Sequence, residues 1–387
     1  MPVLDIVRNQ KIKVVTHSRL IDYMVRRPTH FINRMALNNH VVNLSSTSLK
    51  KFKRIGVTVE KGWKTKSYPL LPKSKIRLVR WLNDFFYTLF LRFNIGSSDI
   101  IWAYEPFNIE KYRTLKRKLL IYEICDDTAE YFREDPTKYK AVLKNEEIIC
   151  KEADIVFTIS NYLKTRKQHL CKNIHVIRNG ADFDHFNQTV TLQKNSMDEL
   201  YYYKRPIIGY HGAVSPYTDF DLLKSLVRAF PEAQFVLIGR INEQVKKQVD
   251  DLLNEPNIFF LGERNYKSLP HYLKYFDVTI IPFTMDQLIL SVNPIKLYEY
   301  LAAGKVVVST PLPEVIQYAE EGIVEIGNTP GDFLSKLRKA ITLADIPEMV
   351  SKRIELALSN SLDARFNEMQ GIIVNYLIST DEKSIDH

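Results

Sequence analysis

The chain has 387 residues, 45% of them hydrophobic and 26% charged, which excludes a disordered, collagen-like or disulfide-stapled protein and favours two globular domains. Its net charge of +9 is uneven, because residues 1–185 carry 34 Lys and Arg against 19 Asp and Glu, whereas the remainder carries 20 against 26. The basic first half therefore favours an anionic partner: nucleic acid, a membrane surface or a phosphorylated substrate.

The first half alternates short apolar stretches with helical segments. Strands are expected at residues 12–16, 41–45, 99–104, 118–124, 155–159 and 174–179. Apolar strands separated by helices are typical of a parallel sheet that is covered on both faces. We therefore predict a Rossmann-like domain over residues 1–186.

One predicted helix of the first half begins with cations and continues with large aromatic residues. Residues 73–93, KSKIRLVRWLNDFFYTLFLRF, begin with Lys73, Lys75, Arg77 and Arg80 and continue with Trp81, Phe85, Phe86, Phe90 and Phe93. Such a helix suits the interface of an anionic membrane. A buried helix with a basic start explains the pattern equally well. The basic segments 50–54 and 111–118 add positive charge, although each is also compatible with a solvated face.

The second half alternates more regularly. The polar segment 187–205 has no clear period and is predicted to be a linker. Strands are expected after it at residues 206–214, 233–239, 257–262, 278–283, 305–310 and 322–327. They predict a second Rossmann-like domain over residues 206–364. Since such sheets bind ligands at the carboxyl ends of their strands, two of them facing each other predict a site in a central cleft.

The stretch SVNPIKLYEYLAAGKVVVST, residues 291–310, predicts a helix followed by a buried strand. Asn293 is expected to be the N-cap, with Pro294 in the first helical position. Gly304 is expected to end the helix.

Lys296 does not fit this helix, because the helix dipole disfavours a cation in the first turn. One explanation is an exposed ion pair with Glu299, which lies three residues further on. The other is a phosphate group held jointly by Lys296 and the helix N-terminus. In that case Glu299 is placed to accept hydrogen bonds from ribose hydroxyls.

Three further residues of the second half follow or end predicted strands. Gly209 and Gly212, in GYHGAVS, would let the backbone approach a diphosphate closely, although an ordinary turn explains them as well. Arg240 ends the second strand and suits a bidentate grip on phosphate, or else a solvated surface position.

In the first half, Asp126 and Asp127 follow a predicted strand in EICDDTAEY. One of them suits a general base, because a carboxylate that is crowded by another or desolvated has a raised pKa. The alternative is a cap for a helix over TAEYF. His17, after the first strand, is a third candidate base, although a lone His is more often structural.

The segment NPIKLYEYLAAGKVVVSTPLPEV resembles the donor site of GT-B glycosyltransferases, and most closely that of bacterial cell-surface polysaccharide enzymes of the teichuronic acid type. IIGYHGAVS, FVLIGR and FFLGERNYKSLPHYLKYFDVTIIPF fit the same family, as do IYEICDDTAEYF and IRNGADFDHF in the first half. The resemblance implies that the second domain binds the donor and the first the acceptor. It also implies that a C-terminal helix, residues 365–387, crosses back to the first domain.

The resemblance assigns roles to individual residues. Glu299 matches the second of two glutamates that many retaining members carry, and it would bind the ribose. The first glutamate, which contacts the donor sugar, is replaced by Ser291, so the donor sugar and the stereochemistry stay open. Asp126 is the preferred base, followed by Asp127. The implied donor-binding residues all lie in the second half: Gly212, Arg240, Arg264, Asn265, Tyr266, Ser291, Asn293, Ile295, Lys296, Leu297 and Glu299.

We therefore expect a glycosyltransferase that moves a sugar from a nucleotide-diphosphate sugar, its co-substrate, to a polysaccharide or glycolipid acceptor in cell-surface glycan biosynthesis. The resemblance implies no cofactor and no metal ion. One alternative is an epimerase of the same fold that hydrolyses its nucleotide-sugar donor, but it does not explain the basic half. Another is a catalytically inactive nucleotide-sugar binding protein, which the serine at position 291 would explain. Nucleic acid is the weakest partner, because the basic segments lack an RNA-binding motif.

The sequence also bears on location. Cys125, Cys150 and Cys171 are odd in number and lack metal-ligand spacing, which indicates a reduced, cytoplasmic protein. MPVLDIVRNQKIKVV lacks the apolar core of a signal peptide, and no run of 18 uncharged apolar residues predicts a spanning helix. With the basic first half, this predicts a peripheral protein at the anionic inner face of the cell membrane.

Overall fold

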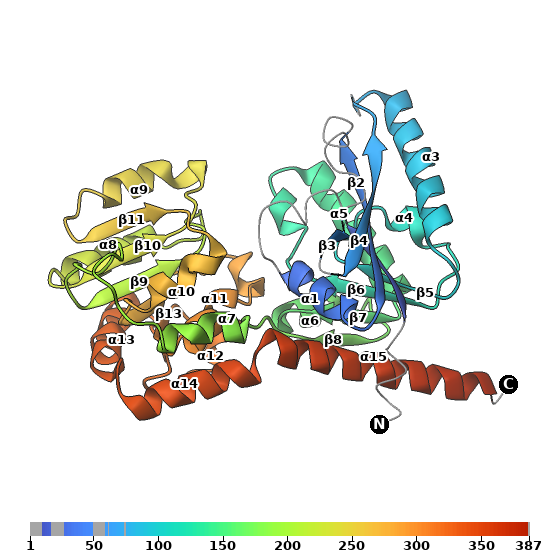
Figure 1. Ribbon diagram of the computed structural model, residues 1–387. Helices are drawn as coiled ribbons and strands as arrows, with labels where there is room; N and C mark the ends of the chain where they lie inside the picture. Colours follow the sequence, from blue (N-terminus) through green and yellow to red (C-terminus); the bar gives the residue numbers. More distant parts are fainter. Residues whose placement is uncertain (1–9, 17–26, 49–58, 61, 73–74, 386–387) are drawn as a thin grey trace. The chain divides into compact units, whose positions relative to one another are not determined.

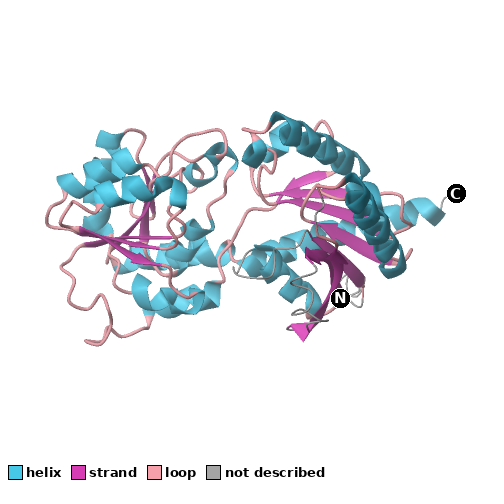
Figure 2. Ribbon diagram, turned by 90° about the horizontal axis from the view of Figure 1, so that it is seen from above, coloured by secondary structure: helices cyan, strands magenta, loops and turns pink. Residues whose placement is uncertain are grey.

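The computed structural model describes residues 10–16, 27–48, 59–60, 62–72 and 75–385. The chain divides into two compact units, one of residues 1–177 with 366–387 and one of residues 178–365. Each unit contains a sheet covered by helices (Figures 1 and 2). The predicted linker 187–205 lies within the second unit, where Leu200 is buried in the core and Tyr203 packs against it.

The sheet of the first unit has eight strands among the described residues, in the order β3-β4-β2-β1-β5-β6-β7-β8. Only the pair β3–β4 is antiparallel. The strands are β1 (Lys11–Thr16), β2 (His40–Ser48), β3 (Val59–Glu60), β4 (Trp63–Leu70), β5 (Asp99–Ala103), β6 (Leu119–Ile124), β7 (Ile155–Thr158) and β8 (Ile174–Val176). The six strands predicted in this half are confirmed, with ends that differ by up to three residues.

Strand β4 was not predicted, although its sequence carries the signal of a half-buried strand. Trp63 and Thr65 are buried, whereas Lys64 and Lys66 are exposed. This alternation has the period of two that a strand requires when one face is solvated. The apolar runs of the central strands are easier to find, because both of their faces are covered.

The helices of the first unit are α1 (Arg27–Ala36), α3 (Arg77–Asn94), α4 (Ile109–Tyr112), α5 (Pro136–Glu152) and α6 (Asn161–Lys167), with a 3₁₀ turn η2 (Glu130–Phe132). Side-chain caps start two of them. Asp135 accepts a hydrogen bond from the Lys138 N–H, and Ser160 accepts one from the Leu163 N–H. Each cap satisfies an N–H group that has no partner inside its helix.

The last helix, α15 (Leu362–Ile385), belongs to the first unit from Phe366 onward. Its side chains Phe366, Met369 and Ile373 are buried. The ring centroid of Phe366 lies 5.9 Å from that of Phe31 in α1. The C-terminal helix is therefore part of the core of the first unit.

The sheet of the second unit is parallel throughout, in the order β11-β10-β9-β12-β13-β14. Its strands are β9 (Ile207–His211), β10 (Gln234–Ile238), β11 (Ile258–Gly262), β12 (Val278–Ile281), β13 (Val306–Ser309) and β14 (Val324–Ile326). All six were predicted and are confirmed. This is the Rossmann strand order 3-2-1-4-5-6. All strands point the same way, but the order in which the chain adds them to the sheet reverses between β9 and β12. A ligand site is therefore expected at the carboxyl end of β9.

The helices of the second unit connect these strands and cover them. They are α7 (Phe183–Asn187), α8 (Phe220–Ala229), α9 (Lys246–Leu252), α10 (Leu269–Leu273), α11 (Ile295–Ala302), α12 (Pro313–Ile316), α13 (Pro330–Leu343) and α14 (Pro347–Ser359). Four 3₁₀ turns accompany them: η3 (Gln188–Val190), η4 (Glu243–Val245), η5 (Tyr266–Ser268) and η6 (Ile289–Ser291). Across the described residues, no helix is both long enough and apolar enough to cross a membrane.

Candidate functional site

The carboxyl end of β9 meets helix α11 at the point where the strand order reverses. His211, the last residue of β9, is buried, and its N–H donates a 2.8 Å hydrogen bond to the Tyr300 hydroxyl of α11. The two rings pack edge to face, with centroids 4.8 Å apart. These contacts fix α11 against the end of the strand, so that its first turn faces the expected ligand site.

Glu299 and His211 form a buried pair at this point. Nε2 of His211 lies 3.3 Å from Oε2 of Glu299. Burial, together with the charge of Lys296, lowers the pKa of His211 to about 3, so the imidazole is neutral at physiological pH. Burial raises the pKa of Glu299 to about 8, with Lys296 opposing the shift and Asp182 adding to it.

Lys296 turns toward aromatic rings. Its Nζ lies 4.3 Å from the ring centroid of Phe283 and 5.0 Å from that of Tyr210. The ring faces attract the cation, but burial still lowers the pKa of Lys296 to about 8, while Glu299 opposes the shift. The alternative of an exposed ion pair with Glu299 is therefore wrong, because Glu299 is buried and the ammonium group is desolvated.

Gly212 borders Lys296. A Cβ atom on Gly212 would lie 3.0 Å from Cε of Lys296, and its φ of +130° is strained for any other residue. Its N–H already donates to the carbonyl of Ile238, so Gly212 makes room for Lys296. Gly209 was proposed to admit a diphosphate, but a Cβ there would fall 1.9 Å from the Phe276 ring. Its role is in core packing.

The start of α11 differs from the prediction. The N-cap is Pro294, and no side chain caps the helix. Asn293 was predicted as the cap, but its Oδ1 accepts a 2.8 Å hydrogen bond from the Asn179 N–H, and its Nδ2 donates to the Tyr298 hydroxyl. The Asn179 side chain also donates to the Asn293 carbonyl, at 2.6 Å. A second segment of the unit therefore holds the helix start.

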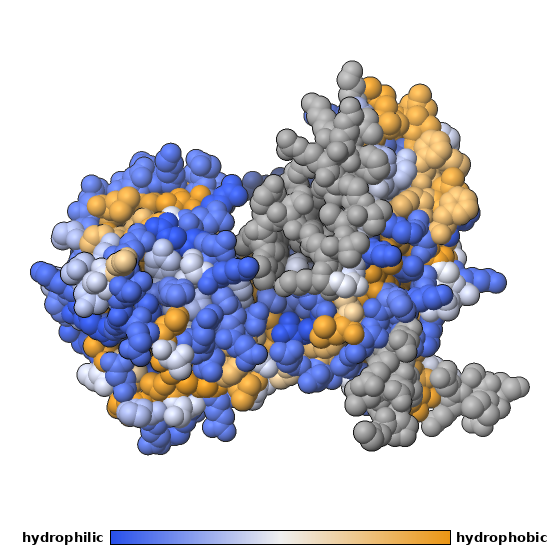
Figure 3. Space-filling view, in the orientation of Figure 1, coloured by the Kyte–Doolittle hydropathy of each residue, from blue (hydrophilic) through white to orange (hydrophobic). Residues whose placement is uncertain are grey.

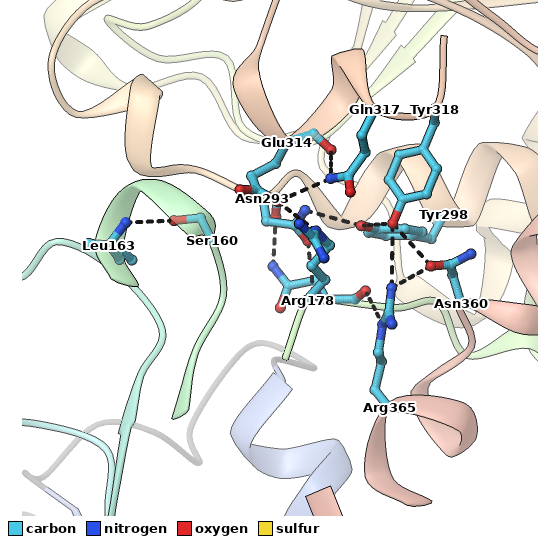
Figure 4. Close-up of polar contacts among 11 residues, drawn as sticks. Ser160, Leu163, Arg178, Asn293, Tyr298, Glu314, Gln317, Tyr318, Asn360 and Arg365 are labelled. Atoms are coloured by element: carbon cyan, nitrogen blue, oxygen red, sulfur yellow. Dashed lines mark hydrogen bonds and ion pairs between the residues drawn. The ribbon is translucent and has the colours of Figure 1, made fainter. Parts of the chain in front are cut away.

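Asn293, which Asn179 contacts, belongs to a polar network in the second unit (Figure 4). Arg178 pairs with Glu314 at 2.7 Å. Elsewhere in the network, the Tyr318 hydroxyl donates to Asn360, which also accepts from Arg365. Asn179 was not predicted as a site residue, although it lies in the segment IRNGADFDHF, because its role depends on contacts more than 100 positions away.

The end of α11 is as predicted. Gly304 has a φ of +71°, its N–H donates to the Leu301 carbonyl, and the Lys305 N–H donates to the Tyr300 carbonyl. These two bonds form a Schellman motif, which ends a helix at a glycine in the left-handed conformation. Buried strand β13 then follows, so the helix is fixed at both ends.

The other predicted donor residues of this segment serve the core to different extents. Leu297 is fully buried and Ile295 is half-buried. Ser291, in place of the family's first glutamate, is buried and donates a 2.7 Å hydrogen bond to the Leu288 carbonyl. Arg240 was expected to end the second strand, but it is exposed and lies two residues beyond the end of β10.

The loop after β11 contains the three residues that were predicted to lie beside the nucleobase. The Arg264 guanidinium donates to Tyr272 at 2.8 Å and to Glu199 at 2.9 Å, so its side chain is engaged within the protein. Asn265 caps the turn η5. The Tyr266 ring stacks on His185, with centroids 4.7 Å apart. An aromatic ring such as that of Tyr266 can pack against the flat face of a nucleobase.

The candidate bases of the first unit have different environments. Asp127 is fully buried and pairs with Arg166, and burial raises the pKa of Asp127 while Arg166 lowers it. Asp126 is exposed. The alternative of a helix cap is wrong, because η2 begins at Glu130 after Ala129, without a side-chain cap. His17 lies outside the described residues. Within the described residues, no His, Cys, Asp and Glu side chains gather as a metal site.

Comparison with known proteins identifies relatives of this chain. Residues 193–356 match the family model described as "Glycosyl transferases group 1". The chain is 28% identical over 209 residues to the "Putative teichuronic acid biosynthesis glycosyltransferase TuaH" of Bacillus subtilis (strain 168). That match covers 52% of this chain and 52% of the relative, so the similarity spans about half the length of the relative. The predicted resemblance to glycosyltransferases of this type is confirmed.

Two solved structures share the fold. A UDP-forming α,α-trehalose-phosphate synthase from Burkholderia xenovorans has a TM-score of 0.71 at 11% identity, covering 95% of this chain and 98% of that one. HepE of Anabaena, in complex with UDP and glucose, has a TM-score of 0.67 at 14% identity, covering 94% and 99%. The predicted GT-B fold, with a Rossmann-like sheet in each unit, is confirmed.

Proposed function

We propose that this chain transfers a sugar from a nucleotide-diphosphate sugar to a polysaccharide or glycolipid acceptor. The observation that carries the proposal is the group of Lys296, Glu299 and His211 at the carboxyl end of β9. This group lies where a Rossmann sheet binds its ligand. Lys296 and Glu299 also lie within the part of the chain that matches the group 1 glycosyltransferase model.

The donor diphosphate would bind at the start of α11. The first N–H groups of a helix have no partner inside the helix, and the dipole favours an anion there. Lys296 is desolvated in this first turn, which disfavours its charge until an anion compensates it. The same ammonium group would stabilise the negative charge of the diphosphate as it leaves the sugar.

The nucleoside would bind beside the diphosphate. Glu299 would accept hydrogen bonds from ribose hydroxyls, with the neutral His211 ring beside it at 3.3 Å between Nε2 and Oε2. The loop with Tyr266 and the backbone near Asn265 would flank the base. The HepE structure holds UDP, which supports a uridine nucleotide as the first donor to be tested.

The acceptor would bind to the first unit, where Asp126 would take the proton from its attacking hydroxyl. Asp126 is preferred because it is exposed, whereas Asp127 is buried and paired with Arg166. We propose that the reaction needs no cofactor and no metal ion, since Lys296 and the helix N-terminus would supply the positive charge. The relative's role in teichuronic acid biosynthesis supports a cell-surface polysaccharide as the acceptor class.

The affinity for a nucleotide-diphosphate sugar is expected to fall above pH 8. Lys296 has a pKa of about 8 in the free protein and loses its charge as the pH rises. Glu299 has a pKa of about 8 and gains a negative charge over the same range. Both changes disfavour a bound anion, so the affinity should be constant near pH 6–7 and about tenfold weaker by pH 9.5. Calorimetric titration with UDP-glucose measures this decline.

Lys296→Arg is the control for this pH dependence. Arginine keeps its charge over the whole range, and its permanent charge would also hold the pKa of Glu299 lower. The variant should therefore bind with a nearly flat pH profile. If the decline above pH 8 is unchanged in Lys296→Arg, another group causes it, and Lys296 does not contact the diphosphate.

A further inference from the structure

Helix α3 has two apolar faces. Its inward face packs through Asn83, Tyr87 and Leu91. A second set of apolar residues is between 38% and 82% exposed: Leu78, Trp81, Phe85, Phe86, Leu89 and Phe93. At 3.6 residues per turn, these six side chains span an arc of about 140° opposite the inward face. Figure 3 shows this apolar surface over α3, at the upper right.

Only part of this outward face was expected from the sequence. Trp81 and Phe85 stack on one another, with ring centroids 5.6 Å apart. Phe90 was grouped with the outward aromatic residues, but it is half-buried and packs against Tyr68. A soluble protein rarely exposes a contiguous set of large apolar residues unless they bind a partner or a membrane.

Cations border this apolar face at both ends of the helix. Lys75, Arg77 and Arg80 are exposed near its start, and Arg92 is exposed near its end. None of the four makes an ion pair with any residue that the structure describes. The one acidic residue of the helix, Asp84, is paired with Lys111 at 2.9 Å. At 3.6 residues per turn, Arg92 lies within the outward arc and Arg77 flanks it, whereas Arg80 lies on the inward side of the helix. Together with Lys75 just before the helix, Arg77 and Arg92 place positive charge at both ends of the apolar face.

We propose that the outward face of α3 docks onto an anionic lipid bilayer. The aromatic and leucine side chains would enter the boundary between headgroups and acyl chains, with the helix axis parallel to the surface. Lys75, Arg77 and Arg92 would lie at the level of the anionic headgroups. A helix of 18 residues gives a contact roughly 27 Å long.

A second copy of the chain is a less suitable occupant. A symmetric dimer through α3 would bring the same uncompensated cations together, and like charges across an interface are unfavourable. An anionic bilayer compensates the charges of Lys75, Arg77 and Arg92 and accepts the apolar face at once. The inference depends on α3 alone and does not require the proposed glycosyl transfer.

The charge component is tested by vesicle co-sedimentation of the full chain. Binding to vesicles of phosphatidylglycerol and phosphatidylcholine should exceed binding to pure phosphatidylcholine, and it should weaken as salt is added. Each cation near the surface contributes about a fivefold change in partitioning. The variant Lys75→Gln/Arg77→Gln/Arg92→Gln should therefore bind about 100-fold more weakly. The control Lys140→Gln/Lys144→Gln/Lys172→Gln removes three exposed charges of the same unit and should bind like wild type.

The apolar component is tested by Trp81→Gln/Phe85→Gln/Phe93→Gln. These side chains are exposed, so the variant should keep the circular dichroism and melting temperature of wild type. It should lose the binding that persists at high salt. The control Met197→Gln/Tyr202→Gln/Leu253→Gln replaces three exposed apolar residues of the second unit and should retain it.

Two results would overturn the proposal. One is equal recovery of wild type with neutral and anionic vesicles, or no recovery with either. The other concerns the variant Trp81→Gln/Phe85→Gln/Phe93→Gln. If this variant folds and binds vesicles like wild type, but is a monomer in sedimentation velocity where wild type is a dimer, α3 serves self-association. If the Gln variant of the aromatic residues unfolds, Phe93→Gln alone decides, because Phe93 is the most exposed of the set.

Discussion

Lys296→Ala is expected to reduce turnover by about 10²–10³-fold. This is the effect of removing one charged or hydrogen-bonding group from a site where negative charge develops. The ammonium group lies within 5.0 Å of two aromatic ring centroids and has a pKa lowered to about 8 by burial, so the site holds a charge at some cost to stability. The folded state should therefore tolerate the substitution, while donor affinity falls together with turnover.

The control for Lys296→Ala is Lys247→Ala. Lys247 is exposed on α9 in the same unit, so the variant loses one positive charge without a change at the strand ends. Steady-state rates and calorimetric affinities of both variants are compared with wild type. If Lys296→Ala folds and turns over within threefold of wild type, the leaving diphosphate is stabilised elsewhere.

Asp126→Asn is expected to reduce turnover by about 10²–10⁴-fold, the usual contribution of a general base. Its affinity for the nucleotide sugar should not change, because the base acts on the acceptor hydroxyl and does not touch the nucleotide. This separation of turnover from donor affinity distinguishes Asp126 from the residues around Lys296. Initial rates at saturating donor, with calorimetry on the same preparation, measure both quantities.

Asp127→Asn is the matched control, since it neutralises the neighbouring carboxylate. Asp127 is fully buried beside Arg166, so its loss should lower the melting temperature and leave turnover of the folded protein close to wild type. If instead Asp127→Asn abolishes turnover and Asp126→Asn does not, the two assignments are reversed. Retained turnover in both variants would exclude this pair as the base.

Most of the fold could be predicted from local sequence patterns. The central strands are continuous apolar runs such as residues 278–281 and 306–309, and their short length and β-branched residues separate them from helices. Strand β4 was missed because it lies toward the edge of its sheet and alternates Lys with buried side chains. The end of α11 could be predicted because a glycine in the left-handed conformation is a local signal.

The site could be predicted only in part. The misfit of Lys296 in a first helical turn is visible in the sequence, whereas its place beside Gly212 is known only from the structure. His211 and Asn179 were missed, because their roles come from contacts with Glu299 and Asn293 across the fold. The strand order would have identified His211, since it places the end of β9 at the reversal point.

The fate of the sugar tests the proposed glycosyl transfer most directly. The full chain is incubated with UDP-glucose and other nucleotide-diphosphate sugars, with and without a lipid-linked or polysaccharide acceptor, and the products are identified by mass spectrometry. Glycosyl transfer predicts nucleoside diphosphate together with an acceptor that has gained one sugar mass, and little release of sugar without acceptor. Free, epimerised sugar that forms equally without acceptor would contradict it and assign the site to a hydrolysing epimerase. Nucleotide binding without any product would assign it to a binding protein.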